Sequence, residues 1–171
     1  MMPATRHIMR TGPLLAMIAL AACARDDEAA MRARLAHWFA LGETQVFTTR
    51  SDCAAGVFAL VDGSVGAAMP VADSVPEMLR LLGLEGRAAL DEPDEAPDGA
   101  LVALANAERA RGMAMRRAGL EARACMDEAA QAAFHAALVS PEVLLAYDAQ
   151  TGTLMLIDRE NRVLFAAMGA G

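Results

Sequence analysis

Residues 143–167, VLLAYDAQTGTLMLIDRENRVLFAA, decide the fold of this chain. They contain three apolar runs, Val143–Tyr147, Thr153–Ile157 and Arg162–Ala167. The two segments between these runs have the composition and the length of hairpin turns. This alternation predicts three antiparallel strands in a meander, with each strand paired to the next along the chain.

A second pair of β-rich segments lies nearer the amino terminus. Thr44–Thr48 alternates in polarity, and Gly56–Val61 has the apolar composition of a buried strand. The polar residues between them predict a turn, which places Cys53 at the bend of a hairpin. The hairpin and the meander together predict an antiparallel sheet of about five strands, and Arg87–Leu90 is a candidate for a further short strand.

Apolar residues at helical spacing predict three or four helices. The predicted helices are one capped by Asp26 or Asp27 and stopped by Gly42, one at Val75–Leu82 with a capping box of Ser74 and Glu77, a long alanine-rich one at Gly99–Ala118, and one at Met126–Val139. Helices packed on an antiparallel sheet make a small single domain of the α+β class.

An acidic segment lies in the middle of the chain. Residues 91–98, DEPDEAPD, contain five acids and two prolines. The prolines exclude a regular helix or an inner strand, so the segment is predicted to be a loop. Its carboxylates also suggest calcium, but the D-x-D-x-D-G spacing of a calcium loop is missing. We therefore favour a solvated acidic loop over a metal site.

The charge composition argues against one class of partner. All 15 basic residues are arginines, and the 22 acids give a net charge of −7. An acidic chain repels a phosphate backbone, so nucleic-acid binding is disfavoured. Four arginines between Arg109 and Arg117 lie toward the carboxyl end of the predicted long helix. They complement the helix dipole there and can also form a basic patch toward anionic lipid headgroups, but we favour a solvated face over lipid contact.

The amino terminus has the plan of an export signal. Arg6 and Arg10 precede an uncharged, mostly apolar run at 12–22. The run is shorter than the roughly 20 apolar residues that a membrane-spanning helix needs. We therefore expect residues 1–22 to be a signal peptide that is removed, and residues 23–171 to form the globular domain. Removal of the two arginines changes the net charge from −7 to −9.

The signal ends in Leu20-Ala21-Ala22-Cys23, an aliphatic residue and two small residues before a cysteine. This sequence resembles the lipobox of bacterial lipoproteins. The resemblance implies that Cys23 becomes the first residue and carries a diacylglyceryl thioether, with a further acyl chain on its amine in Gram-negative members. Two or more acyl chains anchor a protein stably. The resemblance also implies that, in a Gram-negative organism, Ala24 in place of a retaining aspartate favours the outer membrane. The alternative is an ordinary secretory signal followed by a chance cysteine.

A looser resemblance extends into the domain. The stretch 38–44, together with Arg50-Ser51-Asp52-Cys53, is similar to short lipoproteins of alphaproteobacteria that carry no assigned activity. This resemblance therefore implies a location and no chemistry.

The remaining cysteines suit an exported protein. Assigning Cys23 to lipid leaves Cys53 and Cys125, which an oxidising compartment can join in a disulfide. The closed loop of 72 residues would contribute about 4 kcal/mol of stability. The alternative is a thiol nucleophile paired with His37 or His135, but nothing in the sequence places either histidine beside a cysteine.

Other candidate sites are weak. Asp62-Gly63-Ser64-Val65-Gly66 approaches a nucleophile elbow, but an aspartate occupies the position that must be glycine, so we favour a turn. Met113 and Met115 are two residues apart and point to different sides of a helix, which favours packing over a copper site. No cofactor or metal motif is present in the sequence.

These features predict a lipid-anchored protein of the bacterial cell envelope that faces the periplasm. We expect its domain to act without catalysis, as an interaction or structural module whose partners are membrane lipid, through Cys23, and an envelope protein. The alternative is a small-ligand binding or sensing module, which requires an apolar pocket with a few polar groups. A hydrolase ranks third, because it would need His37 or His135 within reach of Ser64, an acid or a thiol.

Overall fold

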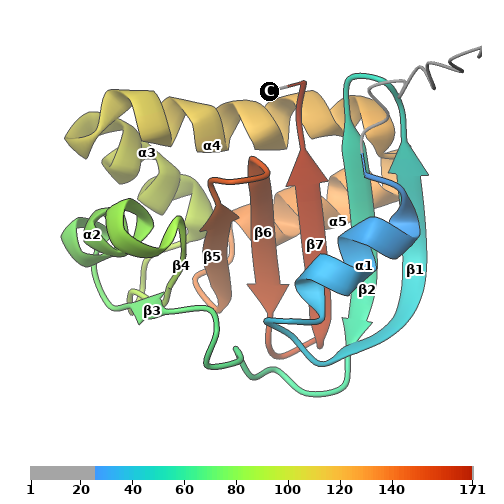
Figure 1. The fold of residues 1–171 in the computed structure, drawn as a ribbon, viewed down its shortest axis with the longest axis horizontal. Helices are drawn as coiled ribbons and strands as arrows, with labels where there is room; N and C mark the ends of the chain where they lie inside the picture. Colours follow the sequence, from blue (N-terminus) through green and yellow to red (C-terminus); the bar gives the residue numbers. More distant parts are fainter. Residues whose placement is uncertain (1–25, 171) are drawn as a thin grey trace, which may run out of the picture.

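The predicted meander forms the middle of a seven-stranded sheet. The computed structural model describes residues 26–170, and its strands are ordered β1-β2-β7-β6-β5-β4-β3 (Figure 1). The strands are β1 (Leu41–Thr49), β2 (Ala54–Leu60), β3 (Val71–Ala72), β4 (Arg87–Leu90), β5 (Val143–Asp148), β6 (Thr153–Asp158) and β7 (Val163–Met168). Neighbouring strands are antiparallel except β3 and β4, which are parallel. The α+β class and the carboxyl-terminal meander are therefore confirmed.

The amino-terminal hairpin joins the rest of the sheet through β7, the last strand along the chain. β2 pairs with β7, so that Ala54 lies opposite Met168 and Ala59 lies opposite Val163. Segments more than a hundred residues apart in the chain are thus neighbours in the sheet. This pairing places the turn of the first hairpin at the same edge as the end of β7 (Figure 1).

Helices cover both faces of the sheet. The helices are α1 (Glu28–Leu35), α2 (Val75–Glu85), α3 (Pro97–Ala107), α4 (Arg109–Ala122), the short 3-10 helix η1 (Arg123–Cys125) and α5 (Glu128–Leu138). α1 lies on one face, and α4 and α5 lie on the other (Figure 1). α2 and α3 extend this second layer beyond β5 toward β4.

The central strands are apolar on both sides because both sides are covered. In β6, Leu154 and Leu156 pack in the core under α4 and α5, whereas Met155 and Ile157 pack in the core under α1. All four side chains are completely buried. A strand covered on one face would alternate in polarity, so the continuous apolar run in the sequence reports two layers of helices.

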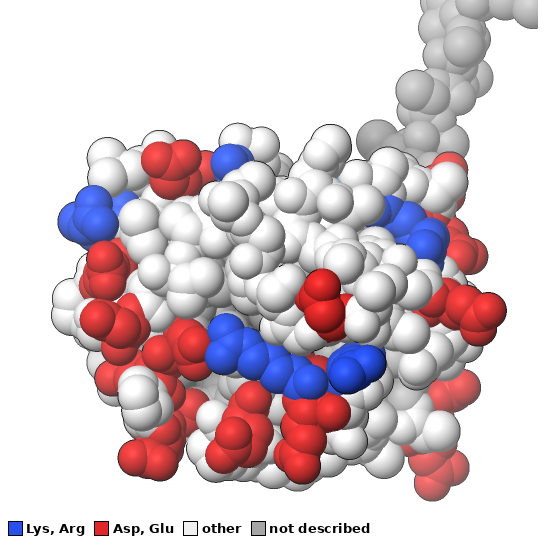
Figure 2. Space-filling view, turned by 90° about the horizontal axis from the view of Figure 1, so that it is seen from below, with Lys and Arg blue, Asp and Glu red and all other residues white. Residues whose placement is uncertain are grey.

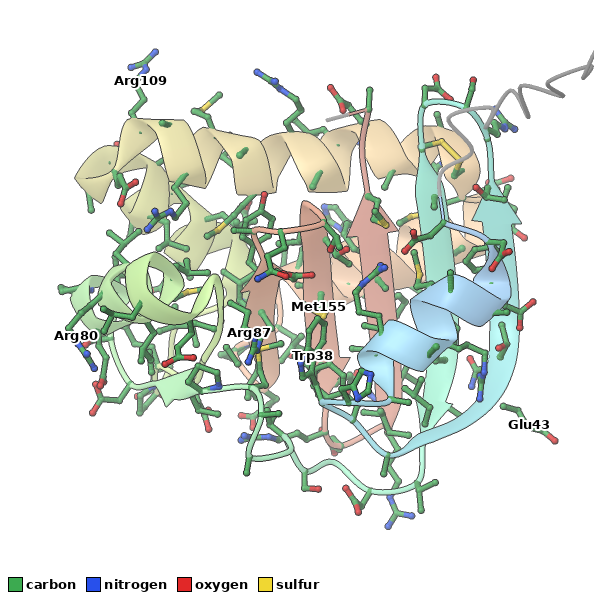
Figure 3. The ribbon with its side chains drawn as sticks, in the orientation of Figure 1. Trp38, Glu43, Arg80, Arg87, Arg109 and Met155 are labelled. Atoms are coloured by element: carbon green, nitrogen blue, oxygen red, sulfur yellow. A yellow bond between two sulfur atoms is a disulfide. The ribbon has the colours of Figure 1, made fainter. Side chains whose placement is uncertain are left out.

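The first helix is shorter than the sequence predicted. The Asp27 carboxylate caps α1 and accepts a hydrogen bond from the Ala30 backbone N–H at 2.7 Å. The helix ends at Leu35, and Gly42 lies inside β1 instead of stopping the helix. Trp38, in the connecting loop, still packs in the α1 core beside Met155 (Figure 3). Burial of a large aromatic side chain therefore holds this loop against the sheet without helical geometry.

Two other predicted helix starts need correction. Ser74 occupies the position before α2, but its side chain makes no capping hydrogen bond, so the predicted capping box with Glu77 is absent. Asp127, predicted in the first turn of the last helix, is instead its cap and accepts from the Ala130 N–H at 2.8 Å.

The predicted long helix at 99–118 is two helices. α3 ends at Ala107, Glu108 has an extended backbone with φ −139° and ψ 93°, and α4 then begins. α3 also starts earlier than predicted, at Pro97, so the acidic loop predicted at 91–98 ends at residue 96. Proline is tolerated there because the first turn of a helix needs no backbone N–H donor.

The break lets α3 and α4 pack against each other at short range. Gly112 is buried inside α4. A Cβ atom on Gly112 would lie 2.3 Å from the backbone nitrogen of Ala105 in α3. Gly119 follows the end predicted for the long helix at Ala118, but it too is inside α4 and faces Leu154 of the sheet. Both glycines serve close packing.

The element counts also differ from the prediction. The described residues form seven strands, not about five: β4 is the candidate short strand at Arg87–Leu90, and the two residues of β3 are too few to show alternation. They form five α-helices because the predicted long helix is divided.

We predict that Gly112→Ala destabilises the protein by about 1–3 kcal/mol, because the added methyl group must push apart two backbones. The matched control is Gly83→Ala in α2, where the new methyl meets no atom within 4 Å. That change should be neutral or stabilising by about 0.5–1 kcal/mol, as expected for replacing a glycine inside a helix. Urea denaturation measures both variants, and equal effects at the two positions would contradict the packing role.

Candidate functional site

The predicted disulfide lies at the edge of the sheet where the first hairpin turns. Cys53 and Cys125 are bonded, with their Cα atoms 5.9 Å apart. Both residues are buried, and the bond joins the start of β2 to the end of η1. A disulfide sulfur is not a thiolate, so neither Cys53 nor Cys125 supplies the free thiol that a cysteine nucleophile would need.

The predicted lipid-attachment residue Cys23 and its lipobox, Leu20, Ala21 and Ala22, lie outside the described residues. The described residues begin at Asp26, three positions after Cys23. The Asp26 carboxylate forms an ion pair with the Arg34 guanidinium of α1. The first described residue is therefore attached to the folded domain.

Arg34 is the centre of a polar cluster that the sequence did not predict. Its Nη2 donates to the Thr153 hydroxyl at 3.4 Å, and its Nε lies 4.0 Å from Asp148 Oδ2. Asp148 is almost completely buried and accepts a hydrogen bond from the Thr151 hydroxyl at 2.5 Å. Two acids thus flank one arginine at the edge of the sheet. Of the three charged groups Asp148 is the buried one, and the Thr151 hydroxyl and the nearby Arg34 offset the cost of burying its charge.

One signal for this cluster was present in the sequence. Side chains alternate between the faces of a strand, so Asp148 falls on the same face as Leu144 and Ala146. Asp148 falls in the segment after Val143–Tyr147 whose composition predicts a turn. Its phase in the strand instead points it into the α1 core, where a carboxylate requires a partner.

Tyr147, on the opposite face of β5, has a perturbed pKa. Burial raises the pKa of its phenol, the neighbouring Asp148 carboxylate raises it further, and Arg111 opposes both effects. The phenol therefore stays protonated at neutral pH, where it can donate a hydrogen bond but cannot act as a base.

An apolar pocket of about 190 Å³ opens between α3, α4 and α5. Its apolar lining is Leu101, Gly119, Leu120, Phe134, Leu138 and Leu154, and its polar lining is Asp98, Arg116, Arg123, Gln131 and His135. Arginines outnumber acids among the lining residues. The pocket can thus accept a short apolar group next to a negative one.

The two histidines of the domain lie apart from the candidate nucleophiles. His37 and His135 are both exposed, on the loop after α1 and on α5. The Ser64 hydroxyl donates to Asp62 Oδ1 at 2.5 Å, and this bond lowers the pKa of the Asp62 carboxyl. No hydrogen bond within residues 26–170 joins either imidazole to Ser64, an acid or a cysteine. Asp62 and Ser64 form a turn, as predicted.

The arginines predicted as a group between Arg109 and Arg117 divide into two sets. Arg109, Arg116 and Arg117 are exposed on α4. Arg111 instead turns toward α2, where its Nη1 donates to the Leu79 carbonyl at 3.1 Å. The exposed basic surface therefore contains three of the four residues.

The predicted metal alternatives find no support within the described part of the chain. No group of three or more histidine, cysteine or acidic side chains converges there to hold a metal ion. Met113 is exposed and Met115 is buried, so the two methionines point to different sides of α4. Among residues 26–170, no helix is long and apolar enough to cross a membrane.

Comparison with known protein families, with curated proteins and with solved structures found no match to this chain.

We predict that the variant C53A/C125A loses about 4 kcal/mol of unfolding free energy, because the unfolded chain is no longer closed into a loop of 72 residues. Urea denaturation with and without a reducing agent measures the loss. Reduction should destabilise the wild type and leave the variant unchanged. A wild type insensitive to complete reduction would contradict a stabilising bridge.

Proposed function

We propose that this protein is a lipid-anchored component of the bacterial cell envelope, and that its domain acts without catalysis through contact with other envelope components. The observation that carries the proposal is the ion pair between Asp26 and Arg34, considered together with the lipobox at Cys23. It attaches the chain to the domain immediately after the residue expected to carry lipid.

The short spacing limits how far the domain can move from the membrane. Three residues span at most about 10 Å when fully extended. If Cys23 carries the lipid, the edge of the domain at which Asp26 lies is at the membrane surface. A protein on a long tether reaches distant partners, whereas this domain is suited to partners in or on the same membrane.

The disulfide supports an exported location. Bonds such as Cys53–Cys125 form and persist in oxidising compartments, of which the bacterial periplasm is one. We propose that the domain faces the periplasm and, because Ala24 follows Cys23 in place of aspartate, that the outer membrane carries it. The proposed partners are membrane lipid and an envelope protein.

We predict that the protein extracted from its own membranes has the mass of a chain beginning at Cys23 plus its acyl groups. Cys23→Ser should remove the acyl mass and release the protein from the membrane fraction, since no covalent lipid then holds it. Intact-mass spectrometry measures both variants, and Cys53→Ser with Cys125→Ser is the control for loss of other cysteines. An unmodified chain beginning at another residue would contradict the anchor.

A second candidate function is the binding of a small amphipathic anion, and the pocket between α3, α4 and α5 favours it. The pocket combines buried Phe134 and Leu154 with the exposed arginines Arg116 and Arg123. Its volume of about 190 Å³ is below the roughly 300 Å³ at which most ligand sites begin. A short alkyl carboxylate is the ligand that its size and charge suit.

For this candidate we expect octanoate to raise the melting temperature of the wild type, because a ligand that binds only the folded state stabilises it. Arg123→Glu should abolish the rise by reversing the charge at the pocket. Arg80→Glu changes an exposed residue of α2 and is the control, which should retain the rise in melting temperature. A melting temperature that octanoate leaves unchanged in the wild type would contradict this candidate.

A further inference from the structure

The outer side of α4 combines arginines with exposed apolar residues. We define the α4 face as Arg109, Met113, Arg116, Arg117 and Leu120, all of which are exposed. Leu120 is 62% exposed and Met113 is 41% exposed. Arg109 points directly away from the domain (Figure 3). An apolar row flanked by arginines is the composition of a helix that lies at a lipid–water interface.

The α4 face is basic on an acidic protein. Residues 109–123 contain five arginines and one acid, whereas the whole chain has a net charge of −7. The single acid, Glu121, lies 3.9 Å from Arg117 and also accepts a hydrogen bond from the Ala170 N–H. Arg109 and Arg116 form no ion pair within the described residues. Their charge is therefore available to an outside anion.

Negative charge collects at the opposite edge of the molecule. An open groove there is lined by the acids Asp91, Glu92, Asp94, Glu142 and Glu160 around Arg159. Figure 2, which views the molecule from this side, shows acidic side chains gathered around a strip of arginine. The domain is thus electrically polarised, and a negatively charged surface attracts the α4 face and repels the acidic edge.

The α4 face belongs to the edge at which the described chain begins. Asp26 pairs with Arg34, whose Nη2 lies 3.6 Å from the Met168 sulfur at the end of β7. Two residues further on, the Ala170 N–H donates to Glu121 of α4 at 2.7 Å. α4 and the carboxyl terminus lie together at this edge (Figure 1). A lipid on Cys23 and the α4 face therefore approach the same plane.

We infer that the α4 face lies on the anionic headgroups of the membrane that holds the Cys23 lipid. This inference rests on the proposed lipid anchor. Arg109, Arg116 and Arg117 bind phosphate groups through charge-assisted hydrogen bonds. Met113 and Leu120 enter the region between the headgroups and the acyl chains. The contact fixes the orientation of the domain, so that the acidic edge points away from the membrane toward its partners.

The test places a reporter in the α4 face of the full-length, lipidated protein. Trp38 is the single tryptophan of the chain and is buried, so an added tryptophan is readily distinguished. Leu120→Trp reports on the α4 face. Val61→Trp is the matched control, because Val61 is 63% exposed and follows β2 at the acidic edge. Both variants are reconstituted in vesicles of brominated phosphatidylcholine, with and without brominated phosphatidylglycerol.

We expect the bromine atoms to quench the fluorescence of Leu120→Trp several-fold more strongly than that of Val61→Trp, and only when phosphatidylglycerol is present. Adding Arg116→Glu to Leu120→Trp should reduce the fraction of molecules whose α4 face lies on the membrane, by about fivefold for each unit of charge removed. Adding Arg80→Glu, which makes the same change of charge on α2, should leave the quenching unaltered.

Two outcomes overturn the inference while the anchor stands. An acylated protein whose Leu120→Trp is not quenched by anionic vesicles leaves the α4 face free for a protein partner. Equal quenching with and without phosphatidylglycerol removes the role of the arginines. A chain that carries no acyl mass contradicts the proposed anchor and this inference with it, and mass spectrometry of the same sample separates that case from the other two.

Discussion

The structure depends on burial of the central strands on both of their faces. Strands β5, β6 and β7 place apolar side chains alternately in two cores, one under α1 and one under α4 and α5. Each fully buried leucine, isoleucine or methionine contributes about 2 kcal/mol relative to an exposed side chain. A sheet of this kind is stable only when helices cover both sides, so the positions of α1 and α4 follow from the composition of the meander.

Three contacts then determine how α4 packs. Gly112 allows close contact with α3, and the disulfide at Cys125 ties the end of η1, which directly follows α4, to the start of β2. Gly119 permits the same helix to approach Leu154 in the sheet. Because the buried side of α4 is held at these points, its other side is presented outward as a fixed surface. The basic and apolar character of that surface is the basis of the proposed contact with lipid.

The sequence predicted the elements that depend on local patterns. The meander, the first hairpin and the helix at Glu128–Leu138 have periodic apolar residues and turn or cap residues at their ends, and these were recognised. The division between α3 and α4 was missed because Glu108 carries no turn signal and alanine favours helix on both sides. The Arg34 cluster was missed because Arg34 lies more than a hundred residues along the chain from its partners Asp148 and Thr153.

The sequence by itself determined the fold class, the strands of the meander and the residues available for a disulfide, because each depends on residue type and on spacing along the chain. Only the tertiary structure decided that β2 pairs with β7, that Cys53 meets Cys125, and that Arg111 leaves the basic surface which Arg109 and Arg116 share. These contacts join residues far apart in the chain. Their energies depend on how two layers of helices pack on one sheet, which no local pattern contains.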